Sequence, residues 1–91
     1  DDVITAGGGD DMLFGGLGQD EFKFANNDGS DTIADFQDGI DLINITSGAS
    51  AISHLTISQQ GDDALISYAN TNIILSDIDI ASISDVDFSF I

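Results

Sequence analysis

Aspartate and glycine recur together at a fixed spacing near the start of the chain. Asp2, Asp11 and Asp20 are nine residues apart, and the last two each follow a glycine-rich stretch. Glycine allows positive φ and close approach of the backbone to a ligand. Aspartate supplies carboxylate oxygens, and calcium takes about six to eight oxygen ligands from carboxylates and main-chain carbonyls. This spacing therefore predicts the binding of a hard cation.

The spacing of nine belongs to a repeated unit. Two segments follow one another, AGGGDDMLF at Ala6–Phe14 and GGLGQDEFK at Gly15–Lys23. The second fits the pattern G-G-x-G-x-D-x-U-x throughout, where U is a large apolar residue, and the first departs from it only at Ala6. Asp1–Thr5 matches the end of the same unit. The repeat resembles the calcium-binding nonapeptide of RTX proteins. A flexible linker rich in glycine and aspartate would not repeat its apolar residues in phase.

The resemblance implies an all-β fold, a flattened parallel β-roll in which successive units fall on opposite sides. Each unit ends in a very short strand that can bury its apolar residue only by stacking on others. Ile4 and Phe22 are then expected side by side in one sheet, with Leu13 in the other.

The resemblance also implies calcium as structural metal, with two to four ions held between neighbouring loops on one side of the roll. We expect the loop Ala6–Asp11 to face Asn26–Asp31, and Gly15–Asp20 to face Asp35–Asp41. The expected metal-ligating residues are Asp2, Ala6, Gly7, Gly8, Gly9, Asp10, Asp11, Gly15, Gly16, Leu17, Gly18, Gln19, Asp20, Asn26, Asp28, Gly29, Asp31, Asp38 and Asp41.

The repeat becomes irregular after Lys23 but does not stop. The string D-x-I-x-D-F-x-x-G-x-D-x-I, from Asp31 to Ile43, resembles the run that closes RTX rolls in serralysin-type proteases and related secreted enzymes. It predicts that Ile33 lies beside Leu13 and Ile43 beside Phe22. End repeats of such arrays are expected to be atypical.

From Ser47 the pattern favours antiparallel strands. Leu55 and Ile57 alternate with polar residues, Ala64–Tyr68 is the next expected strand and Ile73–Leu75 the third, with turns at residues 60–63 and 70–72. Residues 78–86 fit either extended backbone or a short helical turn. The predicted organisation is a parallel β-roll at residues 1–45 and a small antiparallel cap at residues 46–91.

The extreme carboxy-terminal residues combine an acidic stretch with Phe88, Phe90 and Ile91. This combination is similar to the uncleaved signal that type I secretion machinery reads. The alternative is a last edge strand of the cap.

Composition narrows the function further. The chain has 91 residues, no Cys, 17 acidic residues and one basic residue, Lys23, for a net charge of −16. Such a charge excludes nucleic acid as a partner, disfavours an anionic membrane surface and opposes compaction unless cations bind. A halophilic protein would also carry many glutamates, whereas Glu21 is the only one here. No apolar run approaches the ~18 residues of a membrane span.

Residues that could suggest catalysis have simpler explanations. His54 is the only His, no G-x-S-x-G elbow occurs, and Asp62 and Asp63 fit a turn. We expect a non-catalytic module, with any catalytic domain upstream.

The expected function is therefore calcium-dependent folding and secretion of a larger extracellular protein from a Gram-negative bacterium. The expected partners are calcium, the type I secretion machinery during export, and upstream domains of the same polypeptide. The alternative is a polysaccharide- or surface-binding module, as in alginate epimerases and adhesins. That role needs an exposed aromatic or basic groove, and one Tyr, no Trp and one Lys disfavour it.

Overall fold

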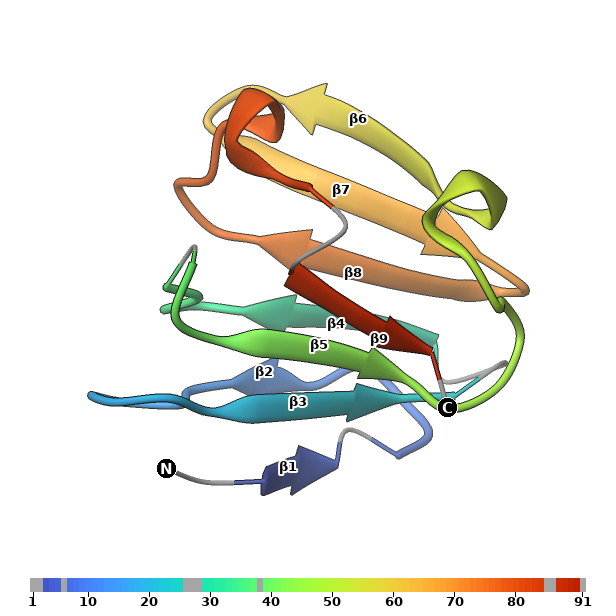
Figure 1. Cartoon of the computed structure of the whole chain (residues 1–91), viewed down its shortest axis with the longest axis horizontal. Helices are drawn as coiled ribbons and strands as arrows, with labels where there is room; N and C mark the ends of the chain where they lie inside the picture. Colours follow the sequence, from blue (N-terminus) through green and yellow to red (C-terminus); the bar gives the residue numbers. More distant parts are fainter. Residues whose placement is uncertain (1–2, 6, 26–28, 38, 85–86, 91) are drawn as a thin grey trace.

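Two β-sheets face each other across one hydrophobic core (Figure 1). The structure is a computed structural model that describes residues 3–5, 7–25, 29–37, 39–84 and 87–90. Within these residues, regular structure consists of strands and two single turns of 3-10 helix. No helix in this part of the chain is long and apolar enough to cross a membrane.

The first sheet has four strands and is parallel throughout. Its order is β1-β3-β5-β9. These strands are β1 (Val3–Thr5), β3 (Glu21–Phe24), β5 (Leu42–Ile45) and β9 (Phe88–Phe90).

The second sheet has five strands in the order β2-β4-β8-β7-β6 and is mixed. β2, β4 and β8 are parallel, whereas β8, β7 and β6 form an antiparallel meander. These strands are β2 (Met12–Leu13), β4 (Gly29–Ile33), β8 (Thr71–Leu75), β7 (Asp63–Tyr68) and β6 (Thr56–Gln60).

The first five strands alternate between the sheets, as a parallel β-roll requires. Ile4 pairs with Phe22, Phe22 with Ile43, and Leu13 with Ile33, which confirms the ladder expected from the repeats. The step along the ladder grows from 18 to 20 to 21 residues. The added residues lie in the loops, so the in-phase apolar residues keep facing the core.

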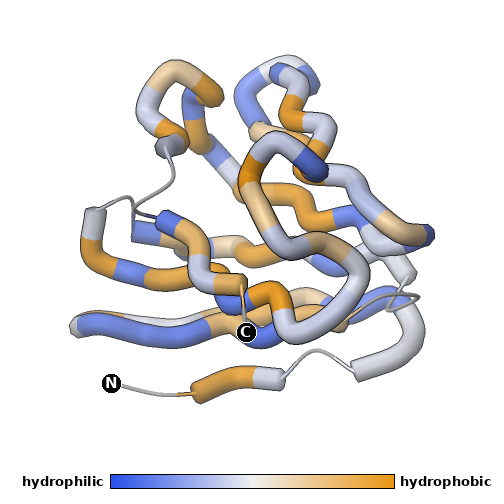
Figure 2. The backbone as a smooth tube through the Cα atoms, turned by 45° about the vertical axis from the view of Figure 1, so that its right-hand side comes forward, coloured by the Kyte–Doolittle hydropathy of each residue, from blue (hydrophilic) through white to orange (hydrophobic). Residues whose placement is uncertain are grey.

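The core fills the space between the two sheets, where the tube in Figure 2 is mostly apolar. Strand alternation sends every second side chain inward, and β7 shows it clearly, with Ala64, Ile66 and Tyr68 buried. The buried apolar residues are Leu13, Phe22, Phe24, Ile33, Phe36, Ile43, Ile45, Ala64, Ile66, Tyr68, Ile73, Leu75 and Phe88.

The segment after residue 45 covers the last turn of the roll, where Ile43 and Ile45 are fully buried. It contains the expected antiparallel strands, but two of its strands also extend the parallel ladders. β8 pairs with β4, and β9 pairs with β5. The cap and the roll therefore share both sheets.

Several details of this segment differ from the sequence-based expectations. The turn before β8 is Ala69–Asn70, and Thr71 and Asn72 already belong to the strand. Ala69 and Asn70 have φ of 39° and 62°, the two consecutive positive values of a type I′ hairpin, whose twist suits antiparallel strands. His54 ends the 3-10 turn η1 (Ile52–His54), and Leu55 lies between this turn and β6 rather than in the strand.

Candidate metal centre

The aspartate of each D-x-U unit points the same way as the apolar residue two positions later. Because side chains alternate along a strand, Asp31 shares the inner side of β4 with Ile33, and both are fully buried. Asp20 and Asp41 stand in the same relation to Phe22 and Ile43, and each is only 3% exposed. The repeat therefore places carboxylates at the rim of the space between the sheets.

Buried carboxylates are costly unless hydrogen bonds or an opposite charge compensate them. The chain offers one Lys and no Arg. That residue, Lys23, alternates with the buried Phe22 and Phe24 along β3, so it lies on the outer face of the sheet. Compensation inside the roll is therefore left to main-chain N–H groups or to bound cations.

The first pair of facing segments, called the first loop pair, joins the loop at residues 7–11 to residues 29–31, which begin β4. The Asp11 amide donates to Asp31 Oδ1 at 2.9 Å, and the Ser30 amide donates to Asp10 Oδ1 at 2.9 Å. Each loop thus supplies a carboxylate that binds the backbone of the other. The loops face one another as the repeat pattern predicted.

The second pair joins residues 15–20 to residues 35–37 and 39–41 at the opposite end of the strands. Asp35 accepts hydrogen bonds from the amides of Gly15 and Gly16, both at 2.8 Å. The Asp20 amide donates to Asp41 Oδ1 at 3.0 Å. This pairing also matches the expectation from the repeats.

Glycine is required where these loops pack most tightly. A Cβ atom on Gly29 would lie 2.7 Å from the Gly9 carbonyl oxygen, and Gly29 has φ of +86°. A Cβ atom on Gly15 would lie 2.5 Å from Asp20 Oδ2. Both glycines bring backbone against oxygen atoms, which is the arrangement a cation site with carbonyl and carboxylate ligands needs.

The oxygen atoms of the first loop pair fit a calcium ion. Asp11 Oδ2 is buried and has no hydrogen-bond partner among the described residues. No group of three or more Asp, Glu, His or Cys side chains gathers in the described ranges. A cation here would therefore combine the carboxylates of facing loops with main-chain carbonyls, a donor set that suits calcium. Such an ion would hold the loops together and add charge compensation.

Comparison with solved structures bears on the fold. The chain is similar to part of the extracellular lipase LipA from Serratia marcescens, with a TM-score of 0.76 and 24% sequence identity. The match covers 98% of this chain and 19% of the lipase chain. No family model matches the sequence. No curated protein matches it either. At this identity the likeness shows a shared all-β architecture.

The remaining sequence-predicted residues are placed as loop residues or lie outside the described part of the chain. Gly7, Gly9, Gly16 and Gly18 have positive φ. Leu17 is 89% exposed, so its side chain has no ligand role and only its carbonyl could contribute. Gly8 and Gln19 lie in the same exposed loops. The predictions for Asp2, Ala6, Asn26, Asp28 and Asp38 fall outside the described residues.

Two carboxylates that structure the loops were missed as site residues. Asp35 is the aspartate of the D-F pair in the closing string D-x-I-x-D-F-x-x-G-x-D-x-I. That pair was a sequence signal for a loop carboxylate. Asp87 is 1% exposed and its Oδ1 accepts from the Gly39 amide at 3.4 Å, across 48 residues of sequence. A contact of that range has no local sequence signal.

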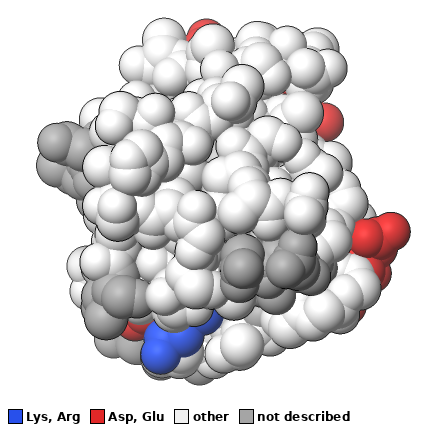
Figure 3. All heavy atoms as spheres, turned by 90° about the vertical axis from the view of Figure 1, so that its right-hand side faces the viewer, with Lys and Arg blue, Asp and Glu red and all other residues white. Residues whose placement is uncertain are grey.

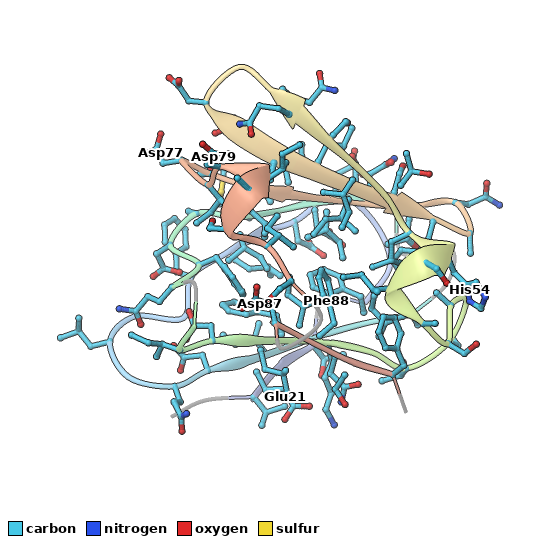
Figure 4. The ribbon with its side chains drawn as sticks, turned by 45° about the horizontal axis from the view of Figure 1, so that its top comes forward. Glu21, His54, Asp77, Asp79, Asp87 and Phe88 are labelled. Atoms are coloured by element: carbon cyan, nitrogen blue, oxygen red, sulfur yellow. The ribbon has the colours of Figure 1, made fainter. Side chains whose placement is uncertain are left out.

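Figure 3 looks at the end that carries the 69–70 turn, and few acidic side chains show on this face. In Figure 4, Asp77 and Asp79 lie close together and well away from His54, whereas Asp87 lies beside Phe88. Asp77 and Asp79 line a shallow pocket with Gln59, beside the 3-10 turn η2 (Ile80–Ser82).

Proposed function

We propose that this chain is a calcium-binding β-roll module of RTX type, and that it folds outside the cell as part of a larger secreted protein. Calcium is the structural metal of this proposal and lies between facing loops of the roll. The module itself is non-catalytic, and chemistry belongs to other domains of the same polypeptide.

One observation carries the proposal. Carboxylates of the repeated D-x-U unit are turned into the interior, with Asp31 fully buried, in a chain whose single basic residue lies on an outer face. Extracellular calcium modules bind with dissociation constants of about 10⁻⁴–10⁻³ M, so such sites fill outside the cell and stay empty in the cytosol. Binding then contributes folding free energy by linkage.

The wider biological setting is argued from the similar fold and from the residues around β9. The lipase with a similar fold is extracellular, and this chain spans 19% of that protein's length. A module that stays expanded at cytosolic calcium suits export by type I machinery, which reads a carboxy-terminal address. The acidic and aromatic residues around Phe88 and Phe90 are the proposed address.

The test is a calcium titration of the chain after it has been stripped with a chelator. Isothermal titration calorimetry should give at least one site with a dissociation constant of about 10⁻⁴–10⁻³ M. Far-UV circular dichroism should gain strand signal over the same range. Magnesium at equal concentration is the control, because it demands near-octahedral geometry and dehydrates reluctantly. No heat of calcium binding at millimolar concentration would contradict the proposal.

A further inference from the structure

The outer face of the four-stranded sheet brings together an amine, a carboxamide and a carboxylate. Asn44 on β5 pairs in register with Lys23 on β3. Glu21 lies two positions before Lys23 and therefore points to the same side of β3. Figure 4 shows Glu21 on the opposite side of this sheet from Phe88. Glu21, Lys23 and Asn44 are called the outer-face triad, and they include the only Lys and the only Glu of the chain.

The Asn44 carboxamide is held in place and shielded from solvent. Its Nδ2 donates a hydrogen bond to Glu21 Oε2 at 2.7 Å. The residue is 3% exposed, although it lies on the outer side of its strand. Its Oδ1 is buried and has no hydrogen-bond partner among the described residues. Native proteins rarely leave a buried carbonyl without a donor, and reactive groups are one of the settings in which they do.

Lys23 lies within reach of this carboxamide. It is half-buried and occupies the neighbouring strand at the same level as Asn44. Neighbouring strands lie about 4.7–4.9 Å apart, and the flexible four-carbon stem of lysine can cross this gap. The three groups are therefore the two reactants and the proton carrier for the transfer of an acyl group from one nitrogen to another.

We propose that Lys23 and Asn44 join in an intramolecular amide bond between β3 and β5. The ammonium of Lys23 releases a proton to solvent, and the neutral amine attacks Asn44 Cγ. A C–N bond forms as an electron pair of the carbonyl moves onto Oδ1. Glu21 takes a proton from Nζ and passes it to Nδ2. The carbonyl then re-forms, the Cγ–Nδ2 bond breaks and ammonia leaves.

The geometry favours each part of this step. Glu21 already bonds to the nitrogen that leaves, within the ~2.6–3.2 Å that proton transfer by a general acid needs. The sheet holds the amine beside the carboxamide, and well-oriented groups within one molecule reach effective concentrations of about 10⁵–10⁸ M. Burial of the carboxamide keeps away water, which is the competing nucleophile.

The bond goes beyond the proposed function, because it needs the folded sheet and no metal ligand takes part in it. The chain has no Cys, so it has no disulfide to restrict its unfolded state. A bond from residue 23 to residue 44 closes a loop and restricts that state in the same way. For a loop of this length, the unfolding equilibrium constant should fall about a hundredfold.

Trypsin tests the bond directly, because it cuts after Lys and Arg and the chain contains Lys23 and no Arg. The wild-type chain is incubated in millimolar calcium, with its strand content checked by circular dichroism. It is then unfolded in urea and digested. The chain should stay in one piece, and its intact mass should be lower by one ammonia. Cleavage after Lys23 into two separate fragments would overturn the proposal.

Lys23→Arg is the matched control. Arginine keeps the positive charge and the trypsin site, but its guanidinium stays protonated and does not attack the carboxamide. This variant should be cut into two fragments. It also distinguishes the proposed bond from ring closure of an Asn on its own main chain, which loses ammonia but leaves the trypsin site open. Equal resistance of Lys23→Arg to trypsin would overturn the proposal.

The role of Glu21 is tested by the rate at which the mass falls. Glu21→Gln keeps an oxygen that accepts from Asn44 Nδ2 but cannot carry the proton. The bond should form about a hundredfold more slowly, since general acid–base catalysis contributes at least about that factor. Asp62→Asn, at an exposed turn position, should react at the wild-type rate. A wild-type rate in Glu21→Gln would overturn the assignment of Glu21 as the proton carrier.

Discussion

At the residue scale, the two-residue alternation of a strand turns a sequence repeat into a row of inward carboxylates. In D-x-U, the apolar residue points into the core, and the aspartate two positions earlier points to the same side of the strand, at the rim of the core. Asp31 and Ile33 are an example. This relation could be predicted from sequence, because it depends only on strand geometry and a fixed spacing.

Asp31→Asn should weaken calcium binding and leave the metal-free chain at least as stable. The change keeps the side-chain shape and one oxygen, but removes a buried charge. Outer-shell changes typically cost about 10–100-fold in metal affinity, so loss of a ligand charge should cost at least ~10-fold. Isothermal titration calorimetry measures the affinity. Asp62→Asn, at an exposed turn position, is the matched control and should bind as wild type. Unchanged affinity in Asp31→Asn would remove Asp31 from the site.

Gly15→Ala should destabilise the chain because its Cβ atom would lie 2.5 Å from Asp20 Oδ2 and 2.9 Å from Phe22 Cζ. Overpacking of this kind costs about 1–3 kcal/mol, measurable by urea unfolding in calcium. Gly8→Ala is the control, since no atom lies within 4 Å of its Cβ position and its φ is not in the left-handed region. Equal stability of the two variants would mean that the Asp20 carboxylate is free to move aside.

At the element scale, the parallel ladders β1-β3-β5 and β2-β4 could be predicted from the repeats, and their residue pairs are confirmed. The parallel pairing of β8 with β4 and of β9 with β5 could not. These strands join the roll across more than 40 residues, as the Thr71 hydroxyl bond to the Ala25 carbonyl illustrates at a separation of 46. Local patterning carries no information about a partner that distant.

Phe88→Ala should lower the free energy of unfolding by about 3–5 kcal/mol, because it empties a buried aromatic site between the sheets. Phe88 is 7% exposed and pairs with Ile43. Phe14→Ala is the control, since Phe14 is 65% exposed; it should change stability by less than ~0.5 kcal/mol. Thermal unfolding in millimolar calcium compares the two. A mild effect of Phe88→Ala would show that β9 adds little to the core.

The proposed export address and the packing role of β9 can be separated in secreting cells. Because Phe88 is buried in the folded chain, an address there is readable only before folding. Deletion of residues 87–91 should abolish type I export. A variant with Phe14→Ala, which keeps β9 intact, should be exported normally. Secretion of the truncated chain at the wild-type level would leave β9 with a packing role alone.

At the scale of the whole molecule, a net charge of −16 on 91 residues sets the response to salt. Screening by monovalent salt relieves repulsion over about 8–10 Å, whereas a bound divalent ion acts at the site itself. Saturation of one site at a hundred times its dissociation constant adds about 2.7 kcal/mol of stability. Calcium should therefore raise the melting temperature far more than sodium chloride of equal ionic strength. A halophilic protein would show the opposite order.

The placement of β9 beside β5 has a consequence for the time course of folding. Ile43 pairs with Phe22 on one side and with Phe88 on the other, and Gly39 contacts Asp87 across 48 residues. The entropy of closing such long loops is lost before the stabilising contacts form. All-β topologies of this kind therefore fold in about milliseconds to seconds. If the amino-terminal side of the chain emerges first, β5 is available before its neighbour β9. If the carboxy-terminal side emerges first, β9 is available before β5. In either direction, the four-stranded sheet forms only after nearly the whole chain is available.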